Sequence, residues 1–332
     1  MILQTKYLGL NLKSPFVLSA SPIGENIDNL KRLDELGIGA VVLHSLFEEQ
    51  LIDDQYELDY HLTHGTESFA EAQSFFPNYD EFKLGPEEYL NHIQKVKSSI
   101  SAPVIASLNG TTIGGWTKYA KNMQDAGADA IELNIYNIPT DLSLTSKAIE
   151  EAYVEILREV KSVVKIPVAV KLSPYFTSLA NIIKRFDDAG ANGFVLFNRF
   201  YQPDINIKTY EVEPKIDLST SANNRISLRW IGILKGKVNA DFAATGGIIT
   251  AQDAAKLILV GASVTQVFAT IARNGIDYLT VLNKELTDIV EEKGFSNVSE
   301  MVGVASQKNI ANPSAFERAQ YMKALTSYKL SF

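Results

Sequence analysis

The chain has 332 residues, of which 46% are hydrophobic and 21% charged, and its formal net charge at neutral pH is −8. This composition predicts a globular protein with ample core, and the acidic balance argues against nucleic-acid binding. The absence of cysteine excludes disulfides, thiolate metal sites and a cysteine nucleophile, and the four scattered histidines argue against a metal site. No apolar run reaches the ~18 residues of a membrane span, and the N-terminus lacks signal-peptide features. We therefore expect a cytoplasmic protein without a membrane segment.

The first predicted element is a hairpin over residues 3–12, where apolar and polar residues alternate around Gly9. Strand and helix patterns then alternate along the rest of the chain. The predicted strands fall within residues 16–21, 36–43, 103–108, 126–133, 167–172, 189–196, 241–245 and 260–264. The clearest helical patterns span residues 27–36, 89–100, 147–164, 179–189 and 251–259.

Four of these strands are preceded by the same signal, a helix that ends in a glycine and a tight turn into an apolar run. The glycines are Gly37, Gly127, Gly190 and Gly261. A βα unit takes roughly 30 residues, so each interval between two successive glycines holds two units. The first interval also contains an insertion. This alternation predicts an α/β fold, a (β/α)8 TIM barrel forming a single domain over residues 1–332, with the hairpin closing its bottom. A doubly wound open sheet is the competing fold.

Two long insertions and a tail interrupt the alternation. Residues 47–85 follow the second strand, and residues 199–227 follow the sixth. Because both follow strands, we expect them over the active-site face of the barrel. Residues 295–332 are predicted to form a polar, partly helical tail packed on the barrel.

Lys171 lies near the end of the fifth predicted strand, in an apolar, β-branched run. A buried ammonium needs an anionic neighbour, a ligand or a covalent role. Three interpretations are open at this point: an ion pair with Glu132, a Schiff-base lysine, or a cation beside a ring that becomes anionic.

Other strand ends carry groups suited to a ligand. Gly246 and Gly247 either bring backbone N–H groups to a phosphate or simply form a tight turn. Asn134 and Asn198 either offer amide groups to a planar heterocycle or cap turns. Taken together, the polar set favours a phosphorylated planar cofactor over the barrel mouth.

The strand-end residues resemble those of the dihydroorotate dehydrogenases. The resemblance covers about residues 7–294 and rests on residues 19–21, 132–134, 170–176, 198 and 244–248. These enzymes are FMN-dependent (β/α)8 barrels that oxidise dihydroorotate to orotate in pyrimidine biosynthesis. The resemblance implies FMN contacts at Ala20, Ser21, Ser45, Asn109, Asn134, Lys171, Gly246, Gly247 and Thr270. It implies substrate contacts at Asn78, Asn134, Asn198 and Arg199. Lys171 would be catalytic, as the cation that stabilises the reduced flavin.

The substrate side departs from the family pattern. The family's catalytic base, a cysteine or serine, falls on Asn137, and a carboxamide is not a useful proton acceptor at neutral pH. A substrate asparagine of the strand-2 insertion falls on Ala72, and the lysine of the soluble branch falls on His44. Tyr136, His44 and Tyr201 are the remaining candidates for proton transfer.

Two further positions differ from the family pattern. Arg199 is a new cation that either receives a substrate carboxylate or is a solvated loop residue. The threonine that holds phosphate in the family aligns with Ala269, with Thr270 one step away.

Three functions remain open from the sequence. The first is an FMN oxidoreductase acting on dihydroorotate or a related cyclic amide. The second is an FMN barrel of the same family with another substrate, or one that relays electrons to a partner protein. The third is a lyase with a Schiff base on Lys171. We expect a small-molecule substrate, a homodimer, and a soluble acceptor such as fumarate, a nicotinamide-linked partner subunit or a redox protein. We expect no metal, nucleic-acid or membrane partner.

Overall fold

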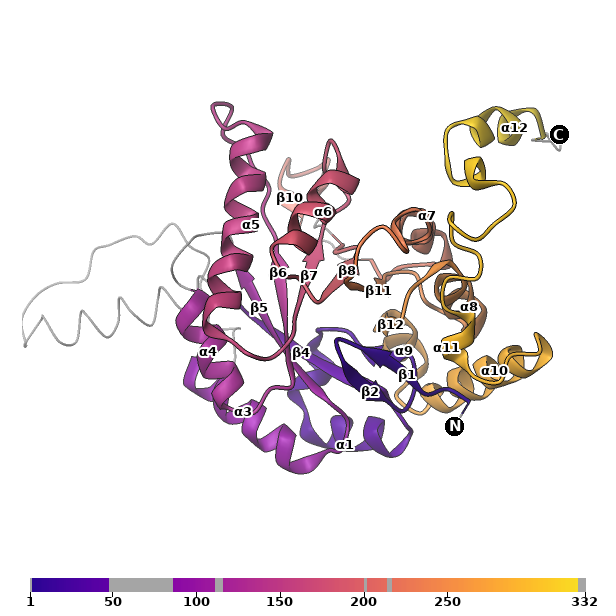
Figure 1. The fold of residues 1–332 in the computed structure, drawn as a ribbon. Helices are drawn as coiled ribbons and strands as arrows, with labels where there is room; N and C mark the ends of the chain where they lie inside the picture. Colours follow the sequence, from indigo (N-terminus) through magenta and orange to yellow (C-terminus); the bar gives the residue numbers. More distant parts are fainter. Residues whose placement is uncertain (1, 48–85, 111–115, 200–201, 214–216, 328–332) are drawn as a thin grey trace, which may run out of the picture.

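The computed structural model describes residues 2–47, 86–110, 116–199, 202–213 and 217–327. Eight parallel strands close into a barrel in the order β11-β12-β3-β4-β5-β6-β7-β8, with helices around it (Figure 1). Because β12 pairs with β3, the sheet has no free edge, so the competing open sheet is wrong and the predicted (β/α)8 barrel is confirmed. The barrel strands are β3 (Phe16–Leu18), β4 (Ala40–Phe47), β5 (Val104–Gly110), β6 (Ala130–Ile135), β7 (Val168–Leu172), β8 (Gly193–Leu196), β11 (Asp241–Thr245) and β12 (Val264–Val267).

The helices follow the strands as the sequence predicts, with ends shifted by a few residues. The principal helices are α1 (Ile27–Glu35), α3 (Pro86–Ser99), α4 (Trp116–Asp125), α5 (Ser146–Val163), α6 (Leu179–Asp188), α7 (Asn224–Leu234), α8 (Ala251–Val260) and α10 (Tyr278–Glu292). Shorter elements are η1 (Pro22–Glu25), η2 (Ser221–Asn223), α9 (Ala269–Asn274), α11 (Val298–Met301), η3 (Pro313–Phe316) and α12 (Ala319–Ser327). The turn glycines Gly37, Gly127, Gly190 and Gly261 all have positive φ, between 83° and 132°, a conformation that disfavours other residues.

The predicted hairpin is present as strands β1 (Thr5–Tyr7) and β2 (Leu10–Leu12), and it closes the bottom of the barrel. Tyr7, Leu8 and Leu12 pack in one buried cluster with inward-facing residues of the barrel strands. A β-carbon at Gly193, where β8 begins, would lie 2.6 Å from Leu8 Cδ2. The absence of a side chain there therefore makes room for the hairpin, and the lower half of the barrel is a packed core.

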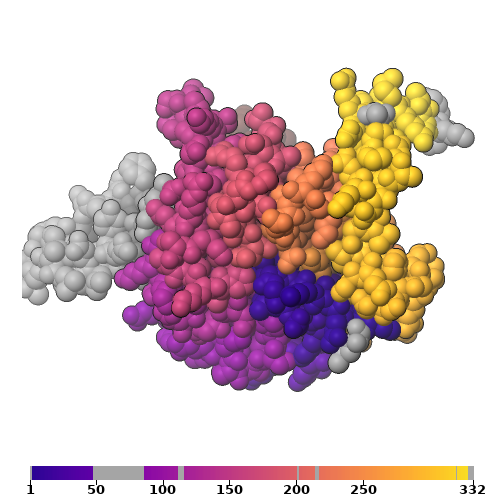
Figure 2. All heavy atoms as spheres, viewed as in Figure 1, coloured from indigo at the N-terminus to yellow at the C-terminus, as the bar shows by residue number. Residues whose placement is uncertain are grey.

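The insertion after β8 contains the short strands β9 (Asp204–Ile205) and β10 (Val212–Glu213), then η2. Beyond Phe47, the insertion after β4 lies outside the described residues. In the C-terminal segment Val298 and Met301 are buried, whereas Tyr321, Met322 and Leu325 of α12 are exposed. Figures 1 and 2 show this yellow segment extending from the barrel body. Among the described residues, no helix is both long and apolar enough to cross a membrane.

Candidate active site

A cavity of about 860 Å³ opens at the carboxyl ends of the barrel strands. This volume is in the range of cofactor and small-molecule sites, and this end of the barrel is where such sites form. Every barrel strand contributes a residue from its end or from the segment that follows. The described part of the insertion after β8 also lines the cavity, as predicted, through residues 202–204 and 217–219.

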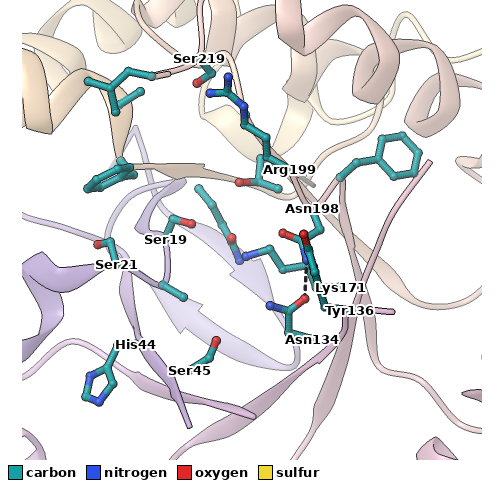
Figure 3. Close-up of a pocket in the computed structure, with 18 of the residues that line it drawn as sticks. Ser19, Ser21, His44, Ser45, Asn134, Tyr136, Lys171, Asn198, Arg199 and Ser219 are labelled. Atoms are coloured by element: carbon teal, nitrogen blue, oxygen red, sulfur yellow. Dashed lines mark hydrogen bonds between the residues drawn. The ribbon is translucent and has the colours of Figure 1, made fainter. Parts of the chain in front are cut away.

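Strand register brings three polar side chains to neighbouring positions of the cavity. Asn109 of β5 lies opposite Asn134 of β6, and Asn134 lies opposite Lys171 of β7. The Asn198 Nδ2 donates to Asn134 Oδ1 at 2.6 Å, so the two amides predicted from the sequence form one unit (Figure 3). All four residues line the cavity.

Lys171 forms an ion pair with Glu132, which was one of the three interpretations of this buried lysine. Its Nζ lies 3.1 Å from Glu132 Oε1, and the two side chains are only 8% and 1% exposed. Glu132 also accepts a hydrogen bond from Gln266 Nε2 at 2.6 Å. Because Lys171 also lines the cavity, the ion pair holds the ammonium at the floor of the site.

Ser45 reaches the cavity through a local irregularity of β4. The pairing of β4 with β5 shifts register between Val42 and Ser45. Such a bulge re-aims side chains. Ser45 Oγ then lies 2.7 Å from Ser107 Oγ. The bulge places His44 and Ser45, two consecutive residues, both on the cavity lining.

Three buried polar atoms on the cavity lining have no hydrogen-bond partner among the described residues. They are Ser21 Oγ, His44 Nδ1 and Gln266 Oε1. Buried polar atoms are nearly always hydrogen-bonded in folded proteins, so their concentration here fits a polar ligand. The mixture of amides, hydroxyls and one ammonium suits a planar heterocycle such as a flavin.

The glycines after β11 differ in their surroundings. Gly246 has a φ of 82° and a β-carbon there would meet no atom within 4 Å, whereas one at Gly247 would lie 2.6 Å from the Asn224 backbone nitrogen. The Gly247 N–H donates to Ser219 Oγ at 3.0 Å. Gly246 thus leaves open space beside the cavity, in agreement with a cradle for a phosphate.

Thr270 and Asn137 are directed away from the main cavity. Thr270 Oγ1 donates to the Ile249 carbonyl, and its neighbour Ala269 lines the cavity instead. Asn137 lines a second cavity of about 390 Å³ and hydrogen-bonds the side chain of Tyr153. The roles given to these two residues by the resemblance stay predictions.

The remaining predicted residues fall into two groups. Ala20, Tyr136 and Arg199 line the main cavity, and the Arg199 Nη1 also donates to the Asp217 carbonyl. Asn78 and Tyr201 lie outside the described residues. Gln266 and Ser219 also line the cavity but were not among the predicted residues; for Gln266, the available signal was a polar residue at a predicted strand end. The described residues contain no cluster of side chains that could hold a metal ion.

His44 is half-buried between the cavity and two aromatic rings. Its ring packs edge-on against Tyr89, with centroids 4.9 Å apart, and lies 5.9 Å from the ring of His92. Burial, with a smaller contribution from the charge of His92, lowers the pKa of His44 to about 4. The imidazole is therefore neutral at neutral pH and can both donate and accept a hydrogen bond.

We expect the lowered pKa of His44 to make the protein acid-sensitive. Between pH 6.5 and about 4 the unfolded chain binds a proton at this residue and the folded chain does not, so stability falls as pH falls through that window. Replacing His44 by glutamine should remove on the order of 1–2 kcal/mol of this loss. Urea unfolding across the window measures it, and an unchanged pH slope in the variant would contradict the assignment.

The fold and the site together define a (β/α)8-barrel protein with a ligand site at the carboxyl ends of its strands. The sequence pattern of the dihydroorotate dehydrogenases matches residues 82–290. The chain therefore belongs to the dihydroorotate dehydrogenase family. It is a flavin-dependent dehydrogenase of this family, whose members act on CH–CH bonds.

Similar proteins come from archaea and bacteria. The catalytic subunit of dihydroorotate dehydrogenase B (NAD(+)) from Thermoplasma volcanium is 28% identical over 92% of this chain and 99% of its own length. The protein of the same name from Methanocaldococcus jannaschii is also 28% identical, with the same coverage. The NAD-dependent dihydropyrimidine dehydrogenase subunit PreA of Escherichia coli K12 is 26% identical over 92% of this chain and 77% of its own length.

Proposed function

We propose that the chain binds FMN in the main cavity and oxidises a cyclic amide of the dihydropyrimidine type, with dihydroorotate as the first candidate. The observation that carries the proposal is the Lys171 ammonium, buried at the cavity floor beside the linked amides of Asn134 and Asn198. The names of the relatives, which act on dihydroorotate or on dihydropyrimidines, support the substrate class.

Different residues of the chain would hold the cofactor's phosphate, contact its ring and stabilise its charge. FMN supplies the hydride acceptor. Gly246 and the Ser219 segment border the space for its phosphate, and Ser21 and Gln266 present unpaired polar atoms to the ring. Lys171 provides a fixed positive charge where negative charge develops, which is preorganised stabilisation.

The amide pair suits a substrate whose ring carries N–H and C=O groups. Because Asn198 Nδ2 donates to Asn134 Oδ1, the Asn134 Nδ2 and the Asn198 Oδ1 are left to meet the substrate, one as donor and one as acceptor. Arg199 adds a guanidinium at the same cavity, which is suited to a carboxylate. Among the candidates for proton transfer, His44 and Tyr136 are the described residues that line the cavity.

An anaerobic titration tests the proposal. Purified protein should carry oxidised flavin, and dihydroorotate added without oxygen should bleach its visible absorbance. A preparation that cannot bind FMN overturns the cofactor assignment. Bound flavin that stays oxidised with dihydroorotate overturns the first substrate only.

The second candidate is oxidation of another substrate of this class, and the position of Asn137 favours it. Asn137 occupies the family's base position but contacts Tyr153 in the second cavity. Bleaching by dihydrouracil but not by dihydroorotate is the result expected for this candidate. No observation favours the Schiff-base lyase, since the Lys171 ammonium is paired with Glu132.

We also propose that electrons leave to a nicotinamide-linked partner subunit. The relatives from Thermoplasma volcanium and Methanocaldococcus jannaschii are named as catalytic subunits of NAD(+)-linked enzymes, which supports this choice over fumarate. The predicted homodimer stays a prediction, and sedimentation of the purified chain measures it.

A further inference from the structure

A buried polar triad lies under the cavity and joins three strands of the barrel. Lys171 of β7 is paired with Glu132 of β6, and Glu132 in turn accepts from Gln266 of β12. Glu132 and Gln266 are 1% and 2% exposed. Glu132 itself is not part of the cavity lining, whereas Lys171 and Gln266 are. The carboxylate therefore acts on a ligand only through its two partners.

The charge of Glu132 is matched by one cation. Among the described residues, Lys171 is the only basic side chain within ion-pair distance of this carboxylate. Burial, with a contribution from the charge of Glu132, raises the pKa of the neighbouring Tyr7 and Tyr89, so both phenols stay neutral. The floor of the cavity is thus an overall neutral Lys171–Glu132 pair, in surroundings where water screens charges weakly.

The bond from Gln266 also orients its own amide. Because a carboxylate can only accept, Nε2 must point at Glu132, which leaves Oε1 as the free acceptor of a residue that lines the cavity. That oxygen is buried and has no partner among the described residues. Gln266 therefore joins the buried carboxylate to the lining of the cavity and keeps one unsatisfied acceptor atom beneath it.

We propose that Glu132 is a positioning residue that holds the Lys171 ammonium at the cavity floor and offsets its charge, and so keeps the reduction potential of the bound flavin low. This inference rests on the proposed binding of FMN. Reduction adds negative charge to the flavin, and an unopposed ammonium would favour that more strongly than the neutral pair does. Glu132 therefore acts through Lys171 and sets how readily the enzyme gives up its electrons.

The test measures the reduction potential of the FMN-loaded protein against reference dyes. Glu132→Gln keeps the size of the side chain and leaves the ammonium unopposed, so the potential should move in the positive direction. We expect at least a tenfold change in the equilibrium with the dye, which is about 30 mV for a two-electron couple. Lys171→Met should move the potential in the opposite direction.

The double variant Glu132→Gln/Lys171→Met removes both charges and leaves no buried ion, so it tests the proposal even where Lys171→Met does not fold. Its potential should lie below that of Glu132→Gln, because the ammonium that the proposal holds responsible for the positive shift is absent. A double variant with the same potential as Glu132→Gln would overturn the proposal, because the shift in that variant would then not come from an unopposed ammonium. An unchanged potential in Glu132→Gln would overturn it equally.

Asp129→Asn is the matched control. Asp129 directly precedes β6, the strand that carries Glu132, but it pairs with Lys97 at 2.7 Å at the opposite end of the barrel. Removal of this paired carboxylate should leave the reduction potential unchanged. A shift equal to that of Glu132→Gln would mean that both shifts come from general destabilisation, and it would overturn the proposal.

An unmodified protein that binds no FMN overturns the proposed function itself. Bound FMN whose potential ignores Glu132 overturns only the present inference.

Discussion

Lys171→Met should slow the reduction of bound flavin by substrate by roughly 10²–10³-fold, the usual effect of removing one preorganised electrostatic group. The ammonium is fixed at the cavity floor by Glu132 at 3.1 Å, and among the described residues Lys171 is the only basic side chain paired with that carboxylate. The same change leaves Glu132 buried and uncompensated, which should cost about 3–5 kcal/mol of folding free energy. Anaerobic stopped-flow reduction measures the first effect, and urea unfolding measures the second.

A matched control separates charge from general disruption. Lys97 is also paired with a carboxylate, Asp129, but at the end of the barrel away from the cavity. Lys97→Met should therefore leave the rate of flavin reduction unchanged. A Lys171→Met variant that folds, binds FMN and is reduced at the rate of the unmodified protein would show that the ammonium has no part in the reaction.

Gly247→Ala should be one of the most damaging single-methyl additions in the site. Its φ of 75° disfavours a side chain, and the new β-carbon would lie 2.6 Å from the Asn224 nitrogen and 2.7 Å from the Thr220 oxygen. Both are backbone atoms, one just before η2 and one at the first residue of α7, so relief requires movement of that segment. Backbone strain and overpacking together should cost about 2–5 kcal/mol. Urea unfolding gives the value.

Gly246→Ala is the control with the same strain and no clash. Its φ is 82°, but the added carbon meets no atom within 4 Å. The stability cost should be only about 1–2 kcal/mol, while the methyl group projects beside the cavity and should weaken FMN binding. Fluorescence titration with FMN measures that binding. Equal destabilisation by the two substitutions would contradict the difference in their surroundings.

The sequence was sufficient to predict most of the fold because its signals are local. A glycine at each of four helix ends has the positive φ that such turns require, so the alternation of helix and strand was readable. The hairpin was equally readable from its alternation around Gly9. By contrast, the bulge in β4 that directs Ser45 inward follows from pairing with β5, which no local pattern specifies.

The sequence indicated which residues border the cavity better than it indicated where each side chain points. Asn134, Lys171, Asn198 and Gly246 all border the main cavity, in agreement with the sequence analysis. Thr270 bonds the Ile249 carbonyl instead, because the path of the chain after β12 turns its hydroxyl away from the cavity. The direction of such a side chain depends on contacts with distant segments, and spacing along the chain does not contain them.

Local signals in the sequence were enough to predict eight strands alternating with helices, polar residues at the strand ends, and a compensating group for the charge of Lys171. These conclusions follow from local periodicity, turn residues and the cost of burying a charge. The ion pair between Lys171 and Glu132, and the hydrogen bond that Gln266 adds to it, are visible only in the folded chain. Glu132 and Lys171 lie on neighbouring strands, whereas Gln266 is 134 positions from Glu132 in the chain. Closure of the barrel is what brings the inward-facing side chain of Gln266 on β12 into contact with Glu132 on β6.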